Sequence, residues 1–497
     1  MRFQRLYTIV VLSVALSGCQ YTSHIQYRAS NGPAPAMKVE DLEKRNDVPD
    51  GSGTTQCAEL LLRDHSVEKF TAPNGEVFTI GVIELSDDGT LKNPEQSNVV
   101  FEEMQRVARG GAAASANSPG AVIVTFVHGW HHRAKTCDEN LSCFRRTMEG
   151  LVMRKGDRQN QGPVFGLYIG WRGESIRNDP YSAMTFYGRK STAHHVGSLG
   201  GKDILLRLDK VQRALDSEVR NATGGQHFVN LVTVGHSFGG AFVYSAFESL
   251  RSPENPANAA PACNGVKPVR QGIGDLVVLV NPAFEAWRYR AFADDLAKPG
   301  TYSPEQHPVL LTVASEADQA VGKAFPAGRT LWLLWHPNAW GHGRAQVDGL
   351  GHYAPYTTNR LVFEGSGEPT PPPSPVLTDQ KQIDDCKLEK EIKNDLVRAQ
   401  CDCSYKVYSQ GIANMTPSAL PRLEPAVGNV PYVVASAPGK LISGHNDIYN
   451  PNFVVFLIHF INQSLQGPGM RKPAAAAAPC TTASLRQGAP ARTPAFR

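Results

Sequence analysis

The sequence lacks the features that define several classes of protein. Beyond the N-terminus, no stretch approaches the roughly 18 uninterrupted apolar residues of a membrane-spanning helix, so none is expected in the body of the chain. The 50 Lys and Arg residues nearly balance 46 Asp and Glu residues, which argues against nucleic acid as the main partner. The adjacent pairs His131/His132 and His194/His195 have no further ligands at zinc-binding spacing. We therefore predict no metal and no cofactor.

What the chain does contain is a regular alternation of strands and helices. With 497 residues, 41% of them hydrophobic, it is able to build a large core. Apolar, β-branched runs predict seven strands, at residues 77–85, 121–127, 164–170, 231–234, 275–280, 308–314 and 432–436. Helical patterns occupy residues 93–109, 141–155, 202–219 and 451–465. This alternation predicts an α/β fold with a mostly parallel, doubly wound sheet and helices on both faces.

The most informative motif is Gly-x-Ser-x-Gly at residues 235–239, within the run LVTVGHSFGG. A short strand enters it and an apolar helical segment leaves it, which is the order of a nucleophile elbow. Such a turn is sharp enough that a Cβ at Gly235 or Gly239 would clash with its surroundings. We therefore predict that Ser237 has a strained backbone and presents its hydroxyl as a nucleophile.

The strand at residues 121–127 ends in His128-Gly129-Trp130. Together, this His-Gly loop and the serine turn resemble the α/β-hydrolase superfamily of serine esterases and lipases. The resemblance covers roughly residues 77–465. It implies an α/β-hydrolase fold whose oxyanion hole is formed by two main-chain N–H groups, those of Phe238 and Trp130.

The same resemblance implies that an acid and then a histidine follow the serine in the chain. Asp318 comes shortly after the strand at 308–314 and is the first choice, while Glu316 and Glu285 remain alternatives. His445 lies between the last strand and the terminal helix and is the first choice of base, with His352 next. His336 and His342 follow the acid strand too closely to be attractive.

The N-terminus indicates export. Arg2 and Arg5 precede an apolar stretch at 6–16, and the following Leu-Ser-Gly-Cys resembles the lipobox of bacterial lipoproteins. This implies removal of residues 1–18 and acylation of Cys19, with several acyl chains giving stable anchoring. Gln20 is typical of outer-membrane lipoproteins, so we expect a lipid-anchored protein of the cell envelope, in the outer membrane if the host is Gram-negative. In that compartment, Cys137 and Cys143 are candidates for a local disulfide, as is Cys386 with Cys401 or Cys403.

Composition divides the chain further. Residues 19–64 are predicted to be a flexible tether and 65–465 the hydrolase domain. Residues 171–199 lack a clear period and suggest a flap, and 325–431 suggest an insertion or cap. Its Trp332, Trp335 and Trp340 either line an acyl pocket or pack the insertion's own core. The tail, 466–497, is predicted to be disordered.

These features predict a serine hydrolase that cleaves carboxylic esters through an acyl-enzyme. The expected partners are a small-molecule ester or lipid substrate and the membrane that holds the lipid anchor. Two alternatives remain open: an acyltransferase with the same catalytic groups, and a non-catalytic envelope lipoprotein that uses the fold as a binding module.

Overall fold

The computed structural model describes residues 26–46, 62–110, 120–154, 161–173, 181–224, 229–255, 262, 265–334, 341–362 and 421–466. Cys19, the signal region, the C-terminal tail and the cysteines at 386, 401 and 403 lie outside these ranges. Trp335 and Trp340 also lie outside them. Among the described residues, no helix is both long and apolar enough to cross a membrane.

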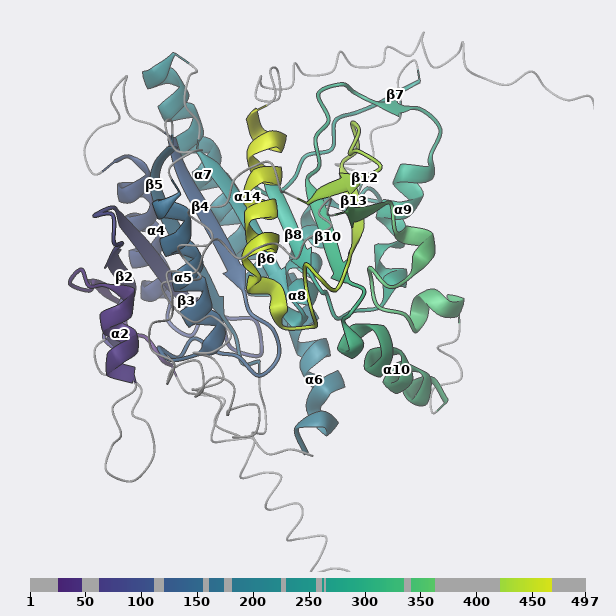
Figure 1. Cartoon of the computed structure of the whole chain (residues 1–497), viewed down its shortest axis with the longest axis horizontal. Coiled ribbons are helices and arrows are strands. Elements are labelled where there is room, and N and C mark those ends of the chain that lie inside the picture. The colour runs from purple at the N-terminus through teal and green to yellow at the C-terminus, as the bar shows by residue number, and fades with distance from the viewer. Residues whose placement is uncertain are drawn as a thin grey trace, which may run out of the picture.

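One large sheet runs through the molecule (Figure 1). Neighbouring strands are parallel except for the pairs β2–β3 and β11–β12, which are antiparallel. In spatial order the strands are β1 (Asn31–Pro33), β2 (His65–Thr71), β3 (Val77–Glu84), β5 (Gln161–Gly170), β4 (Gly120–Val127), β6 (Asn230–His236), β8 (Leu276–Val280), β10 (Leu310–Ser315), β13 (Tyr432–Ala437), β11 (Asn359–Val362) and β12 (Arg422–Glu424). All seven predicted strands are present, and the predicted α/β class with a mostly parallel sheet is confirmed.

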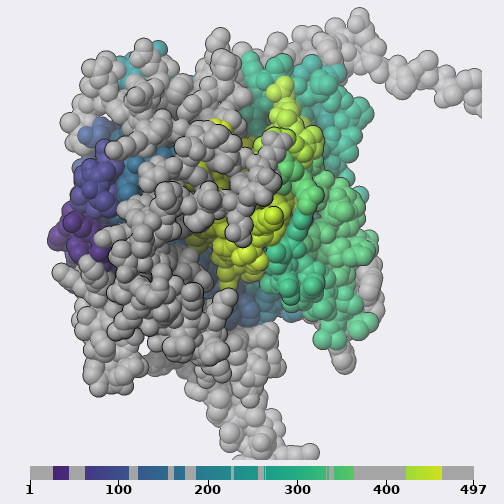
Figure 2. Space-filling view, viewed as in Figure 1, coloured from purple at the N-terminus to yellow at the C-terminus, as the bar shows by residue number. Residues whose placement is uncertain are grey.

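Helices cover both faces of this sheet. One face packs on α4 (Pro94–Ala108), α7 (Lys202–Thr223), α8 (Phe238–Arg251) and α9 (Arg290–Ala297). The other packs on α2 (Val39–Asn46), α5 (Glu139–Met153) and α14 (Pro451–Gln466), and in the space-filling view the yellow C-terminal residues surface in the middle of this face (Figure 2). The strands supply both cores because successive side chains point to opposite faces: Ile123 joins the first core and Phe126 the second.

The predicted tether at 19–64 is wrong in its middle part, because residues 26–46 pack on the body. They form β1 and α2, and the side chains of Val39 and Leu42 are buried. The Arg28 guanidinium lies 2.7 Å from the Glu68 carboxylate, which also pairs with Arg145 at 2.7 Å. The sequence looked like a tether because these partners are far away along the chain.

The predicted flap at 171–199 is a helix for most of its length. Trp171 is buried at the end of β5, and α6 (Tyr181–Val196) continues through a π-helical turn (Gly197–Gly201) into α7. Gly197 and Gly201 pack directly on Phe242 of α8, where a Cβ at Gly197 would lie 2.2 Å from the Phe242 carbonyl oxygen. This contact on α8, rather than an amphipathic stripe, holds the helix in place.

Residues 325–431, predicted to be an insertion or cap, contribute in part to the sheet. β11 pairs in parallel with β13, and β12 pairs with β11, so the sheet extends beyond the last predicted strand. The same region begins with α10 (Phe325–Leu334), which carries Trp332. The predicted disulfide between Cys137 and Cys143 is present and lies at the start of α5.

Candidate active site

Ser237 occupies the turn between β6 and α8. Its backbone has φ +56° and ψ −119°, a left-handed conformation that costs on the order of 1–3 kcal/mol for a residue with a side chain. Neighbouring backbone holds it there, because the Ser237 N–H donates to the Val280 carbonyl at 3.1 Å and the Ala283 N–H donates to the Ser237 carbonyl at 3.2 Å. The predicted strained turn is therefore present.

The glycines of the motif leave room for this turn. A Cβ at Gly235 would lie 2.5 Å from the Gly239 carbonyl oxygen, and a Cβ at Gly239 would lie 2.1 Å from the Val127 carbonyl oxygen. Real Cβ atoms do not approach backbone oxygens this closely, so the strand, the turn and β4 fit together only with glycine at both positions. The steric prediction made from the motif is confirmed.

The structure brings together the three side chains predicted from distant parts of the chain. The Ser237 hydroxyl lies 2.8 Å from His445 Nε2, and His445 Nδ1 lies 2.8 Å from Asp318 Oδ2. With a neutral imidazole protonated on Nδ1, Ser237 donates to His445 and His445 donates to Asp318. Ser237 is 4% exposed and the Asp318 side chain is fully buried, while the His445 side chain is 21% exposed.

The environment of Asp318 favours its ionised form. Burial by itself raises a carboxyl pKa, but the hydrogen bond and charge of His445 and the Val321 N–H outweigh it, so the pKa of Asp318 is lowered. The Val321 N–H donates to Asp318 Oδ1 at 3.0 Å. Both carboxylate oxygens are therefore engaged, which orients Asp318 toward His445.

The alternative acids lie elsewhere. Glu316 is near the surface and pairs with Arg360 at 3.1 Å. Glu285 is buried in a different cluster, where it pairs with Lys190 and, at 2.9 Å, with Arg329. Burial is the main reason that the pKa of Lys190 falls to about 8 despite this carboxylate.

Of the alternative histidines, the two that the structure describes, His342 and His352, form no hydrogen bond with Ser237. His352 packs its ring against Gly322, close to Asp318, and burial lowers its pKa. His342 stacks on Trp287 with ring centroids 5.0 Å apart, and His336 lies outside the described residues. Among the candidate bases that the structure describes, His445 is the one in contact with the serine.

Two residues that the sequence analysis did not single out hold His445 in place. The Asn281 amide donates to the His445 carbonyl oxygen at 2.9 Å, and His236 Nε2 lies 2.9 Å from the same oxygen. Asn281 is fully buried with φ +45°, and its Oδ1 accepts the Ser315 N–H at 2.8 Å. An Asn directly after a buried strand was the available signal, because Asn tolerates this conformation better than most residues.

His236 is suited to donate this hydrogen bond as a neutral ring. Burial first, and then repulsion by His445, lower its pKa well below the ordinary value. Its Nδ1 is buried without a hydrogen-bond partner among the described residues, so the proton belongs on Nε2, facing the His445 carbonyl.

The His128-Gly129-Trp130 loop lies against the serine. A Cβ at Gly129 would approach the Ser237 Cβ to 2.9 Å, so only glycine allows this contact. His128 is fully buried; its Nε2 accepts the Trp171 N–H at 3.1 Å, and its carbonyl accepts the Trp171 indole N–H at 2.9 Å. Burial lowers the pKa of His128 to about 4, so the ring is neutral and its acceptor nitrogen is preserved.

The two predicted oxyanion donors belong to neighbouring residues in space. Phe238 is the first residue of α8, where backbone N–H groups have no partner within the helix. Trp130 follows Gly129, and its ring centroid is 6.2 Å from that of Phe238. The structure thus brings both residues to the serine turn.

Aromatic side chains form an apolar wall beside the turn. We call Trp130, Phe186, Tyr187, Phe238 and Phe325 the aromatic cluster. Phe186 of α6 is its centre, with ring centroids 4.7 Å from Phe238, 5.2 Å from Trp130 and 6.2 Å from Phe325. Trp130 and Phe186 are partly exposed. Helices α6 and α10 thereby meet the active-site turn.

Within the described ranges, no group of three or more His, Cys, Asp or Glu side chains is arranged to hold a metal. His132, for example, pairs instead with Asp138 at 3.2 Å and lies 3.0 Å from the Asn140 amide nitrogen.

No protein-family model and no curated protein matches the sequence. A cutinase from Trichoderma reesei, in complex with a C11Y4 phosphonate inhibitor, aligns at 16% identity over 46% of this chain and 76% of that chain, with a TM-score of 0.17. An uncharacterized protein from Pseudomonas aeruginosa aligns at 11% identity over 46% of this chain and 40% of that chain, with a TM-score of 0.20. Similarities this weak support no conclusion about function.

Proposed function

We propose that this protein is a serine hydrolase of the α/β-hydrolase fold that cleaves carboxylic esters. The observation that carries the proposal is the hydrogen-bonded chain from Ser237 through His445 to Asp318 at a strained turn between a strand and a helix. A nucleophile, a base within 2.8 Å and a buried acid that orients the base are the groups that acyl transfer requires.

In this mechanism, Ser237 Oγ bonds to the ester carbonyl carbon as its proton passes to His445 Nε2. Asp318 keeps the imidazole oriented and stabilises its cationic form. The C–O bond then breaks and the proton leaves with the alcohol. Water, activated by the same histidine, attacks the acyl-enzyme and releases the carboxylic acid and free serine.

The oxyanion formed in each step needs two N–H donors. We assign them to the main chain of Trp130 and Phe238, because Gly129 packs tightly against the Ser237 side chain and Trp130 is the next residue of that loop. Loss of one such donor lowers the rate by roughly a hundred- to a thousandfold in serine hydrolases. The partly exposed rings of Trp130 and Phe186 favour a substrate with an apolar group beside the scissile bond.

We further propose that the protein is a lipoprotein of the bacterial cell envelope, acylated at Cys19. The support is the lipobox-like sequence at residues 16–19, after a short apolar stretch with Arg2 and Arg5 before it. Mass spectrometry of the mature N-terminus tests this directly: acyl chains on Cys19 are expected, and an unmodified Cys19 or an uncleaved N-terminus contradicts the assignment.

Active-site labelling tests the hydrolase. The chain that begins at Gln20 is treated with a fluorophosphonate, and its intact mass is measured beside that of Ser237→Ala. One adduct on the wild type and none on the folded variant is the expected result. An unreactive, folded wild type would instead support a binding module, and transfer of the acyl group to an added alcohol in preference to water would identify an acyltransferase.

A further inference from the structure

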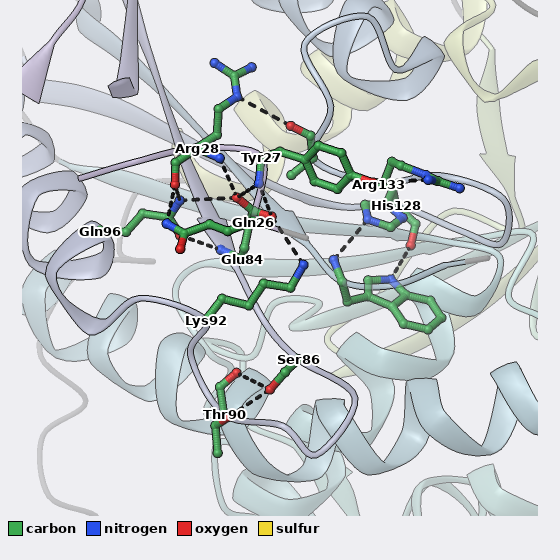
Figure 3. Close-up of polar contacts among 12 residues, drawn as sticks. Gln26, Tyr27, Arg28, Glu84, Ser86, Thr90, Lys92, Gln96, His128 and Arg133 are labelled. Atoms are coloured by element: carbon green, nitrogen blue, oxygen red, sulfur yellow. Dashed lines mark hydrogen bonds and ion pairs between the residues drawn. The ribbon is translucent and has the colours of Figure 1, made fainter. Parts of the chain in front are cut away.

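The N-terminal segment joins the body at the end of β3, through Glu84. The Glu84 carboxylate accepts the N–H of Tyr27 at 3.0 Å and 3.1 Å and the N–H of Arg28 at 2.9 Å (Figure 3). Lys92 lies 3.4 Å from the same carboxylate. Glu84 is the last residue of β3, so the chain enters the body at the carboxyl end of that strand.

This entry point is on the same edge of the sheet as the serine. Glu84 pairs with Gly170 of β5. Because β5, β4 and β6 are neighbouring parallel strands, the residues level with Gly170 at their carboxyl ends lead across the sheet to His236. His236 immediately precedes Ser237. Three strand spacings of about 4.8 Å separate β3 from β6, so the entry point is about 14 Å from the active site along the edge.

The attachment is firm from Tyr27 onward. The Tyr27 hydroxyl accepts a hydrogen bond at 3.1 Å from Arg133, three residues after Trp130. Arg28 is 1% exposed, and its guanidinium donates to the Glu68 carboxylate at 2.7 Å and to the Leu62 carbonyl at 3.1 Å. Releasing this segment would remove one of the two arginine partners of the buried Glu68 and the two main-chain N–H donors of the buried Glu84, which is unfavourable.

Little chain separates this attachment from the proposed lipid. Tyr27 is the eighth residue after Cys19. Even fully extended, 8 residues span at most about 28 Å. The membrane that holds the acyl chains is therefore within that distance of the entry point, whereas a tether running to residue 64 would have left the body free to tumble.

The same edge exposes apolar side chains. Leu331 and Leu334 of α10 are 59% and 66% exposed, the two highest values among the large hydrophobic side chains that the structure describes as exposed. They are three residues apart and so lie on neighbouring surface of the helix. α10 follows β10 and Asp318 in the chain, and it extends with α6 from the lower end of the molecule in Figure 1.

We propose that the carboxyl edge of the sheet faces the bilayer that holds Cys19, with Leu331 and Leu334 in contact with lipid. The proposal rests on the hydrolase function and the lipid attachment proposed above. The short tether holds this edge at the membrane, and the two leucines bury apolar surface there. In this orientation the active site faces the bilayer. The expected substrates are therefore ester-linked lipids of that membrane.

Photo-crosslinking tests the orientation without requiring catalysis. The full-length acylated protein, carrying Ser237→Ala, is reconstituted on vesicles of phosphatidylethanolamine and phosphatidylglycerol. A benzoylphenylalanine replaces either Leu334 or Val266, which is 43% exposed on β7 (Val266–Lys267) at the opposite, upper end in Figure 1. At least roughly tenfold more lipid adduct is expected from position 334. Equal yields, or more adduct from position 266, would overturn the proposal.

An insertion tests the role of the short tether. About 20 Gly and Ser residues placed after Gln20 lengthen the reach and are expected to lower the ratio of adducts at 334 to those at 266 by roughly threefold or more. The same residues placed after Gln466, at the end of α14, should leave the ratio unchanged. If the insertion after Gln20 left the ratio of adducts unchanged, the short tether would not be what orients the body.

A kinetic measurement links the orientation to substrate. The double variant Leu331→Asp, Leu334→Asp is expected to lower the ratio of vesicle-borne ester hydrolysis to short-chain ester hydrolysis by roughly tenfold. Val266→Asp should not change it, and an unchanged ratio in the double variant would contradict lipid contact by α10. If the wild type cleaved neither ester, the hydrolase proposal would fail, while the crosslinking result would still decide the orientation.

Discussion

The Asn281 side-chain amide donates a hydrogen bond of 2.9 Å to the main-chain carbonyl of His445. The two residues are distant in sequence, and the contact ties the end of β8 to the loop that carries the imidazole. His236 Nε2 reaches the same carbonyl, so the residue before the nucleophile and the residue after β8 hold the base together. Asn281 and His236 thus position the His445 ring through its main-chain carbonyl, and neither of them bonds to the ring nitrogens.

Loss of this hydrogen bond should reduce catalysis more than substrate binding. In Asn281→Gly, the backbone still tolerates φ +45° but the amide is gone, so kcat for an ester should fall by roughly 10- to 100-fold with KM changed less than about threefold. Asn281→Asp should fall at least as far, because a carboxylate oxygen then faces the His445 carbonyl. Steady-state kinetics measure the effect, and a kcat within about twofold of wild type for both folded variants would contradict it.

The choice between neighbouring acids is testable by a matched pair of variants. Asp318→Asn should lower kcat by roughly 10³- to 10⁴-fold, because an amide neither stabilises the imidazolium nor selects its reactive tautomer. Glu316→Gln, two residues earlier and paired with the exposed Arg360, should leave kcat within about twofold. Fluorophosphonate labelling rates should follow the same order. Equal losses in both variants would remove Asp318 from its assigned role.

The glycine at position 239 should be required for folding. Gly239→Ala would place a Cβ 2.1 Å from the Val127 carbonyl oxygen, where only a backbone shift relieves the clash, so the free energy of unfolding should fall by about 3 kcal/mol or more. Gly188→Ala in α6 is the control, because its added Cβ would meet nothing within 4 Å beyond the neighbouring backbone of its own helix. That variant should be neutral or more stable by up to about 1 kcal/mol. Urea unfolding measures both, and equal effects would refute the steric argument.

His128 should make the protein less stable in mild acid. Its pKa is about 4 when folded, lowered mainly by burial, against about 6.5 in an unfolded chain. Because the pKa of His128 is lower in the folded protein, the neutral ring favours the folded state fully above about pH 6.5. This contribution to the free energy of unfolding, about 3 kcal/mol, is lost as the pH falls toward about 4. Protonation would also place a hydrogen on Nε2, where the Trp171 N–H now donates.

The variant His128→Gln isolates this contribution. Glutamine supplies an acceptor near the position of Nε2 but does not titrate, so the free energy of unfolding should depend less steeply on pH between about 6.5 and 4.5. His236 and His194, whose pKa values burial also lowers, remain in both proteins and cancel in the comparison. Identical slopes for wild type and variant would show that His128 is not the group that titrates.

Local features of the molecule could be predicted from the sequence because their causes are local. The strands of the parallel sheet are continuous apolar runs, since both faces are buried, and all seven were identifiable. The turn at Ser237 was identifiable because only glycine fits at positions 235 and 239. The disulfide between Cys137 and Cys143 followed from their closeness in the chain.

The tertiary structure decided what depends on contacts between distant residues. Asp318 rather than Glu285 meets His445 because β10 and β13 are neighbours, whereas Glu285 is neutralised by Lys190 and Arg329. Residues 26–46 were predicted to be a tether because they are polar. Their partners, such as Glu68 and Glu84, are distant in the sequence and meet them only in the folded protein. The pattern of apolar residues along one helix or strand indicates which of its side chains are buried. Which charged residues of different elements form pairs depends instead on which strands are neighbours in the folded sheet.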